Sequence, residues 1–351
     1  MRILIDICHP AHAHFFRHPV EILRRTGHEV LITSRIKEVA VPLLESFGWE
    51  HRSLSSANSG RLSGVLMELV KRDYNLRQVV KNFGPQVMAA VGGTFVAQVG
   101  FLTGTRSVVF YDTEEARIQN FLTYPFATLV TVPACYRGWL PARSQRYKGY
   151  HELSYLHPDR FSPSLQAAVA NGVDPTRPNF LIRVVAWKAN HDIGMRGWST
   201  PLLEKVVRHL AHRGNVLISS EGDLPPTLRN WAYVGDPLQI HHVMAHCRLV
   251  VGESATMASE AAVLGVPALF VARTWRGYTD EQEHRYGLVR TLRELGLDGI
   301  IEAIDELLAI DRAEWPVRRD ALLNDTIDVA GYVASLLEAV GESRKRDGNY
   351  E

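Results

Sequence analysis

Residues 247–271 read CRLVVGESATMASEAAVLGVPALFV, and this stretch decides the fold. Its apolar run at 249–251 predicts a short strand buried in a parallel sheet. A turn of small residues follows at 252–256, and a run of helix-forming residues occupies 257–264. Gly265 is placed to end that helix, and a second apolar run at 268–271 predicts another strand. The order strand, turn, helix, strand predicts one βαβ unit with a right-handed crossover.

The turn of this unit is suited to binding an anion. Ser254, Ala255 and Thr256 are small and lie at a predicted helix N-terminus, where free N–H groups and the helix dipole favour negative charge. Glu260 follows Thr256 by one helical turn, so its carboxylate could accept hydrogen bonds from the diol of a ribose held at the same place. The alternative is structural: Ser254 caps a core helix and Glu260 is solvated.

Composition excludes several classes of protein. A length of 351 residues favours two domains, and 39 Lys and Arg against 38 Asp and Glu leave no general charge for binding nucleic acid or an anionic membrane, although a local patch stays open. The three cysteines, Cys8, Cys135 and Cys247, are scattered, which argues against a disulfide framework or a zinc site. Residues 2–7 already read as a strand, and no apolar run could span a bilayer, so we expect a cytoplasmic protein without a transmembrane segment.

Strand-like and helix-like segments alternate twice along the chain, which predicts an α/β protein with two Rossmann-like domains. We expect an N-terminal domain at 1–150, a Pro-rich polar linker at 151–178, a C-terminal domain at 179–341 and a frayed tail at 342–351. Open parallel sheets bind ligands beyond the carboxyl ends of their strands. In the first domain this rule selects the loops at 8–15, 92–95 and 112–117.

Motifs along nearly the whole chain resemble a family of GT-B-fold predicted glycosyltransferases, itself largely uncharacterised. They are HPAHAHFF, YDTEEARIQNFLTYPFAT, HPDRFSP, WKANHD and GESATMASEAAVLG. The last motif is similar to the nucleotide-binding segment of UDP-sugar glycosyltransferases and UDP-N-acetylglucosamine 2-epimerases. The resemblance implies two facing Rossmann-like domains with parallel sheets and an interdomain cleft. It also implies that Ser254, Ala255 and Thr256 meet the diphosphate of a nucleotide sugar and that Glu260 meets its ribose.

The loop at 8–15 is rich in histidine. An imidazole titrates near neutral pH, so His12 or His14 could act as a general base. The loop is similar to that of the bacterial N-acetylglucosaminyltransferase that completes the lipid-linked cell-wall precursor, and the similarity assigns the base to His12. Two alternatives stay open: the His-Ala-His pair binds a metal ion, as in amidohydrolases, or the histidines cap a helix.

Acidic residues follow the strand predicted at 106–111. Asp112 and Glu114 could bind sugar hydroxyls or take part in acid/base chemistry. Alternatively, Asp112 or Thr113 caps a helix whose dipole favours Glu114 and Glu115. The 2-epimerases carry a Gly-Asp-Thr turn after an earlier strand. Here that turn is Gly92-Gly93-Thr94, without the acidic residue, which favours transfer to an acceptor over epimerisation.

Further polar residues of the second domain are assigned to the donor. Arg183 and Lys188 could neutralise a departing diphosphate, with surface ion pairs as the alternative. Ser220 ends a predicted strand facing the nucleotide, and the loop at 231–240 resembles the one that holds the base. Asp280 and Gln282 fall where related enzymes bind the donor sugar, unless this segment is only a helix N-terminus. The paired His242 and His246 read as surface or packing residues.

The sequence therefore predicts a metal-independent glycosyltransferase of polysaccharide biosynthesis without a cofactor. Its partners would be a nucleotide-sugar donor, UDP-linked by resemblance, and a sugar, lipid-linked or small-molecule acceptor, with no nucleic acid. The alternatives are a nucleotide-sugar epimerase or hydrolase of the same fold, a non-catalytic nucleotide-sugar-binding protein, and a metal hydrolase built on the histidine loop. The sugar, the acceptor, the stereochemistry and the oligomeric state are not determined by the sequence.

Overall fold

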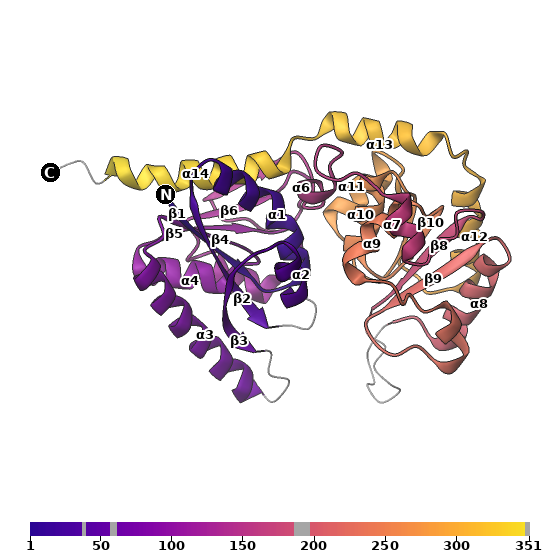
Figure 1. Ribbon diagram of the computed structural model, residues 1–351, viewed down its shortest axis with the longest axis horizontal. Coiled ribbons are helices and arrows are strands. Elements are labelled where there is room, and N and C mark those ends of the chain that lie inside the picture. The colour runs from indigo at the N-terminus through magenta and orange to yellow at the C-terminus, as the bar shows by residue number, and fades with distance from the viewer. Residues whose placement is uncertain (37–39, 57–61, 186–196, 348–351) are drawn as a thin grey trace. The chain divides into compact units, whose positions relative to one another are not determined.

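The computed structural model describes residues 1–36, 40–56, 62–185 and 197–347. The chain forms two compact units, one built from Met1–Tyr155 with Ile327–Glu351 and the other from Leu156–Thr326 (Figure 1). The predicted α/β class with two parallel sheets is confirmed, whereas the interdomain cleft stays a prediction. Among the described residues, no helix combines the length and the apolar character needed to cross a bilayer.

The first unit contains a parallel sheet of seven strands in the order β3-β2-β1-β4-β5-β6-β7. The central strand β1 is apolar from Ile3 to Ile5 and fully buried, as expected for a strand covered on both faces. The strands are β1 (Arg2–Ile7), β2 (Glu29–Ile36), β3 (His51–Ser56), β4 (Val87–Val91), β5 (Arg106–Phe110), β6 (Leu129–Pro133) and β7 (Ser144–Tyr147).

Helices cover both faces of this sheet (Figure 1). One face carries α1 (Pro10–Arg25), α2 (Ala40–Ser46) and α14 (Val329–Asp347), and the other carries α3 (Leu62–Phe83), α4 (Thr94–Thr103) and α5 (Arg117–Thr123). Short α6 (Leu153–Leu156) lies beside α1. Pro19 inside α1 cannot donate to the carbonyl of Phe15, and the hydroxyl of Ser154 donates to that carbonyl instead at 2.6 Å. This bond ties the segment after β7 to the first helix.

The second unit contains a parallel sheet of five strands in the order β12-β11-β10-β8-β9. The strands are β8 (Asn179–Val184), β9 (Asn215–Ser220), β10 (Leu249–Gly252), β11 (Ala268–Val271) and β12 (Val289–Leu292). One face packs against α8 (Thr200–Ala211) and α12 (Leu297–Ala309). The remaining helices of the unit are α7 (Leu165–Ala170), η1 (Pro226–Trp231), η2 (Pro237–Gln239), α9 (Ile240–Ala245), α10 (Ala255–Leu264), α11 (Gly277–His284) and α13 (Glu314–Asp325).

The stretch at 247–271 has the predicted order of strand, turn, helix and strand, but α10 begins at Ala255 rather than at 257 and Gly252 belongs to β10. Strand β10 leads through a turn into α10, and β11 pairs in parallel with β10. Gly265 adopts the left-handed conformation with φ +78° and ends α10. Gly252 has to be glycine because a Cβ there would overlap the carbonyl oxygen of Arg183 on the neighbouring strand β8.

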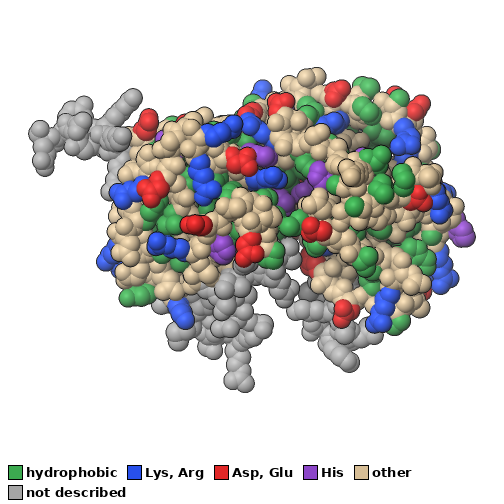
Figure 2. All heavy atoms as spheres, in the orientation of Figure 1, with side chains coloured by type: hydrophobic (Ala, Val, Ile, Leu, Met, Phe, Trp, Pro, Cys, Tyr) green, Lys and Arg blue, Asp and Glu red, His purple; other side chains and the backbone are tan. Residues whose placement is uncertain are grey.

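The division into units differs from the predicted domains of 1–150 and 179–341. Helix α14 returns to the first unit, where it packs on α1, so the second unit ends at Thr326. Residues 151–155 belong to the first unit, and α7 packs on α9, so the segment at 151–178 is not a linker. The predicted tail from 342 is wrong up to Asp347, where α14 ends. Basic and acidic side chains are interspersed over the face of the molecule in Figure 2, as the near-zero net charge leads one to expect.

Candidate functional site

In the first unit, a histidine and a carboxylate meet at the carboxyl edge of the sheet. Asp112 follows β5, and its Oδ2 lies 3.2 Å from Nδ1 of His151, which follows β7. His151 is buried, with its ring against Phe15 at 4.4 Å between centroids. The side chain of Asp112 is 21% exposed, so a ligand can reach it.

Electrostatics keep Asp112 ionised. Burial alone would raise the pKa of this carboxyl, but the attraction of His151, hydrogen bonds from His151 and Thr113, and the nearby His12 lower it to about 2. Asp112 is therefore an acceptor at neutral pH and cannot supply a proton. The structure brings His12 and Asp112 together as electrostatic neighbours, in agreement with the two predicted loops sharing one edge.

The histidine loop is shorter than predicted. Helix α1 begins at Pro10, with His9 as its N-cap through a 3.2 Å bond from the Ala11 amide. His12 and His14 thus lie on a helix, where residues two apart point to different sides. His14 stacks on Tyr155 at 5.2 Å and meets the edge of Phe47. Among the described residues, no group of three or more His, Cys, Asp or Glu is placed to hold a metal ion.

The acidic loop does not serve as a helix cap. Helix α5 begins at Arg117 with Ala116 as its N-cap, and no side chain caps it, so the capping alternative for Asp112 is wrong. Glu114 is buried and accepts a 3.3 Å hydrogen bond from the Arg137 amide. It fastens the segment after β6 to the loop, and its predicted contact with a sugar stays a prediction.

A second buried charge cluster lies inside the first unit. Asp6, at 1% exposure, accepts bonds of 2.8 and 3.0 Å from Arg72, at 0% exposure, and one of 2.7 Å from Thr33. Arg72 also reaches Cys8 at 3.3 Å and lies over the ring of Phe95. Burial, the Asp6 charge and a hydrogen bond to Asp6 raise the pKa of the Cys8 thiol, so it stays protonated.

In the second unit, polar residues gather at the carboxyl ends of β8, β9 and β10. Arg183 donates to Ser219 at 2.9 Å and pairs with Glu221 at 2.7 Å. The ion-pair alternative for Arg183 is thus present in the structure, and its role toward a diphosphate stays a prediction. Ser220 accepts a bond from the Gly222 amide and is half-buried. Lys188 lies outside the described residues.

The turn after β10 contains a serine that caps a helix and a glutamate that accepts hydrogen bonds from two backbone amides. The hydroxyl of Ser254 caps α10 by accepting from the Met257 amide at 3.2 Å, as the structural alternative predicted. Ala255 and Thr256 open the helix and are half-buried. Their N–H groups belong to the first turn, which has no intrahelical partners. The carboxylate of Glu253 accepts from the amides of Val185 and Trp198, and burial raises its pKa.

Glu260 is buried rather than solvated. Its Oε1 lies 2.9 Å from Nε2 of His241 on α9, and each residue is 6% exposed. The i, i+4 spacing in the sequence points to the neighbouring His242 and His246 and gives no sign of His241. His242 accepts from the Ser164 amide, and burial and the adjacent His241 and His246 lower its pKa.

The two residues assigned to the donor sugar lie on α11. Asp280 is buried in its first turn, with Arg293 at 3.9 Å, so the helix N-terminus alternative is present in the structure. Gln282 is fully buried and donates to Ser259 of α10 at 2.8 Å. Its side chain therefore packs α11 on α10, and sugar contact by either residue stays a prediction.

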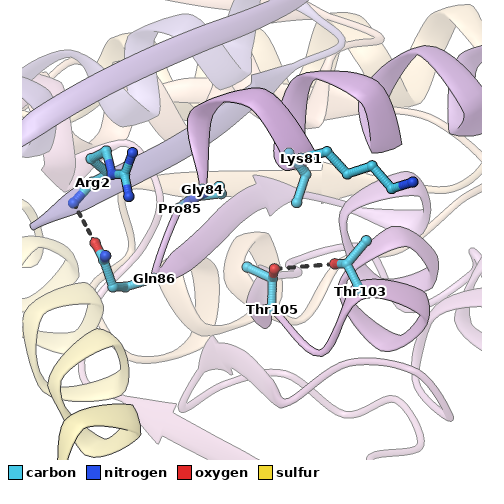
Figure 3. Close-up of a pocket in the computed structure, with 8 residues that line it drawn as sticks. Arg2, Lys81, Gly84, Pro85, Gln86, Thr103 and Thr105 are labelled. Carbon is cyan, nitrogen blue, oxygen red and sulfur yellow. Dashed lines mark hydrogen bonds between the residues drawn. The ribbon is translucent and has the colours of Figure 1, made fainter.

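The described cavities lie elsewhere. One of about 530 Å³ opens at the amino ends of the strands of the first unit and is lined by Arg2, Lys81, Gln86, Thr103 and Thr105 among others (Figure 3). Another of about 400 Å³ lies beside α8. Neither contains a predicted site residue. We place the candidate site at the carboxyl edges, because the polar side chains converge there and open parallel sheets bind ligands there.

Comparison with known proteins agrees with this architecture. Residues 1–158 match the model of a family described as a protein of unknown function, DUF354. The uncharacterized protein MJ0665 of Methanocaldococcus jannaschii is 20% identical over 76% of this chain and 80% of its own length. These two matches confirm the resemblance, drawn from the motifs, to a largely uncharacterised family.

Solved structures of two kinds share the fold. The UDP-GlcNAc 2-epimerase of Neisseria meningitidis, bound to UDP-GlcNAc, is 13% identical, with a TM-score of 0.66 over 97% of this chain and 99% of its own. The spinosyn rhamnosyltransferase SpnG is 14% identical, with a TM-score of 0.64 over 96% of this chain and 100% of its own. At such identities the likeness shows the fold alone, which is that of GT-B enzymes.

Proposed function

We propose that the protein is a glycosyltransferase that moves a sugar from a UDP-linked donor to an acceptor. The second unit would bind the donor and the first would present the acceptor. Fold comparison supports an enzyme of the nucleotide-sugar class but includes both transferases and epimerases. The packing around Gly93 is the observation that favours glycosyl transfer rather than epimerisation.

Gly93 occupies the position at which the 2-epimerases carry an acidic residue in their Gly-Asp-Thr turn. A Cβ at Gly93 would lie 2.8 Å from Cγ1 of Val109 and 3.0 Å from Cβ of Ala90, closer than side chains pack. The turn has no room for a carboxylate unless β4 and β5 shift. Epimerisation at C2 needs acid/base groups around the sugar, and this position cannot supply one, whereas transfer needs a base for the acceptor alone.

The base in this proposal is His12. As the acceptor oxygen attacks the anomeric carbon, its proton passes to the imidazole, and the bond from that carbon to the diphosphate breaks with its electron pair on the leaving oxygen. The ionised Asp112 next to His12 stabilises the imidazolium that forms. His151 holds Asp112 in place at 3.2 Å.

The leaving group would be held in the second unit. The first-turn amides of α10 and the hydroxyls of Ser254 and Thr256 face the charge that develops on the diphosphate. Arg183 adds a cation at the adjacent strand end, and Glu260 would accept from the ribose diol. A metal ion is not needed in this scheme, because Arg183 and the N-terminus of α10 together neutralise the negative charge of the departing diphosphate.

The first experiment is calorimetric binding of UDP, GDP, CMP and dTDP with and without EDTA. We expect a preference for UDP that EDTA leaves unchanged. His12→Ala should keep UDP affinity and lower turnover of the matching UDP-sugar about 100-fold or more, because it removes the base. His212→Ala, an exposed histidine on the second unit, is the matched control.

Three outcomes would count against the proposal. Failure to bind any of the nucleotides would remove the donor site. Exchange of the C2 hydrogen of UDP-N-acetylglucosamine with deuterium from solvent would favour the 2-epimerase, which the full-length similarity to the Neisseria enzyme makes the second candidate. UDP binding without turnover of any donor would leave a non-catalytic binding protein.

A further inference from the structure

The first unit exposes an unusual concentration of large apolar side chains. We call this surface the α4–α5 patch. Its members are between 45% and 79% exposed, and they are Phe101, Leu102, Ile118, Phe121, Leu122 and Trp139. Phe121 stacks on Trp139 at 5.7 Å, and Gln98 of α4 donates to the carbonyl of Leu122, so the patch is one surface rather than scattered residues.

Helix α5 exposes apolar side chains and buries polar ones, which is the reverse of the usual distribution on a surface helix. Ile118, Phe121 and Leu122, spaced as one helical face, point to solvent, while Asn120 and Thr123 are buried. The buried pair has its own partners: Asn120 reaches the Tyr136 hydroxyl at 3.4 Å, and Thr123 lies 2.8 Å from Thr94. Because these bonds fix α5 in this orientation, the apolar face is presented outward as part of the fold.

The same part of the chain is basic. Residues 74–151 contain eight Lys and Arg against three Asp and Glu, although the whole chain is nearly balanced. Residues 116–151 contain five cations and no carboxylate, and Arg117, Arg137, Arg143 and Arg146 are exposed. Of the three acids, Glu114 is buried and Asp112 is paired with His151. The chain's near-zero net charge hides this basic region.

We propose that the α4–α5 patch docks the protein on the surface of an anionic phospholipid bilayer. Exposed Phe, Leu and Ile would enter the boundary between headgroups and acyl chains, Trp139 would lie at headgroup level, and the arginines would meet lipid phosphates. The docking is peripheral, since among the described residues no helix could cross a membrane.

Charge argues against a second copy of this chain as the occupant. A twofold dimer brings the same patch of both subunits together, so arginines would face arginines. Within residues 74–151, all of which the structure describes, Glu115 is the one acid that is exposed. An anionic membrane supplies the missing negative charge, and like charges across a protein interface would oppose association.

Docking also suggests what the acceptor is. Helix α5 begins five residues after Asp112, so the patch adjoins the loop proposed to present the acceptor. Resting on the proposed function, this proximity points to an acceptor held in the bilayer by a lipid. The docking itself does not depend on the transfer reaction.

The test is co-sedimentation of the full chain with vesicles of phosphatidylcholine alone and of phosphatidylcholine with phosphatidylglycerol. We expect binding to the second and little to the first, weakening as salt is raised. Ile118→Ser with Phe121→Ser should lower the partition coefficient at least tenfold. The matched control is Leu165→Ser with Val317→Ser, which are 49% and 65% exposed on the second unit and lie outside the residues assigned to the donor. Arg117→Ser should lower the partition coefficient about fivefold, as expected for one cation near a charged membrane. Its control is Arg312→Ser, which changes an exposed arginine of the second unit and should leave the partition coefficient unchanged.

Circular dichroism and thermal unfolding confirm that each variant is folded before its binding is measured. Absence of vesicle binding by the parent chain, or equal binding by the parent and the Ile118/Phe121 variant, would overturn the proposal. So would a dimer, seen by analytical ultracentrifugation, that the same variant dissociates without any vesicle binding. Calorimetry with UDP on the same samples separates the two proposals: UDP binding without vesicle binding refutes docking alone, and vesicle binding without UDP binding refutes the proposed function alone.

Discussion

Assignment of Glu260 to a ribose leads to a quantitative prediction. The carboxylate is 6% exposed and lies 2.9 Å from His241 through Oε1. An ionised carboxylate has about four acceptor positions, so one partner leaves capacity for a diol. A hydrogen bond to a charged group contributes about 1.5–3 kcal/mol, so Glu260→Ala should weaken UDP binding by about 10- to 150-fold.

The assay measures binding while the protein and the ligand are each changed, first separately and then together. Calorimetry compares UDP with its 2′-deoxy and 3′-deoxy analogues on the parent and on Glu260→Ala. On the parent, loss of the hydroxyl that Glu260 accepts should cost about tenfold or more, and on the variant the same loss should cost almost nothing. Ser259→Ala is the control, because Ser259 is buried on the same helix, bonds Gln282 and leaves the carboxylate in place.

Removing one member of a buried charged pair can unfold a protein, with losses of about 3–5 kcal/mol. Glu260→Gln therefore serves as a second variant that keeps the volume and loses the acceptor charge. The reasoning is refuted if the parent binds the deoxy analogues as tightly as UDP, or if a folded Glu260 variant still distinguishes them. Glu260 would then be a packing residue that His241 satisfies.

Three further predictions concern stability. Arg72→Met, which leaves Asp6 buried without its cation, should lower the free energy of unfolding in urea by about 3–5 kcal/mol, and adding Asp6→Asn should recover most of it; a loss under about 1 kcal/mol would show the pair to be unimportant. Gly93→Ala should lower the free energy of unfolding by about 1–3 kcal/mol because the new Cβ would contact Val109. Gly299→Ala on α12 has open space around it and should raise the free energy of unfolding by about 0.5–1 kcal/mol. Equal effects of the two substitutions would contradict the tight packing around Gly93. Because the pKa of Asp112 in the folded protein is lowered to about 2, its ionisation adds stability above about pH 4 that is lost as pH falls toward 2. Asp112→Asn should therefore lower the free energy of unfolding by about 2 kcal/mol at neutral pH, and the variant and the parent should become equally stable near pH 2. Unfolding curves at several pH values test this prediction.

Strands and the central βαβ unit were predictable because their signal is local. Apolar runs located β1 and β11 to the residue, and Gly265 marked the end of α10. The start of α1 was missed because His9, which caps it, is not among the side chains that usually do so. Pro10 at the first helical position was the available signal.

The candidate site was only half predictable, because its partners come from distant parts of the chain. Asp112 and the Ser254 turn stand out by their position after strands, but His151 and His241 reach their carboxylates through tertiary packing. The pair of Asp6 and Arg72 had one sequence signal, an acid inside the apolar strand RILIDI. A buried acid needs a partner, yet nothing in the sequence says that α3 provides it.

Helices α14 and α5 show where the limit lies. Periodicity tells which residues of a helix share a face, but the partner of that face is a property of the folded chain. For α14 the face packs on α1, far away in sequence, so assignment by sequence order gave it to the wrong unit. For α5 the apolar face stays mostly exposed, with Phe121 stacked on the exposed Trp139, and the polar face is the buried one. Burial of apolar surface within its own unit does not explain a helix that buries asparagine and threonine while it exposes isoleucine and phenylalanine, and the proposed membrane surface gives this face a partner.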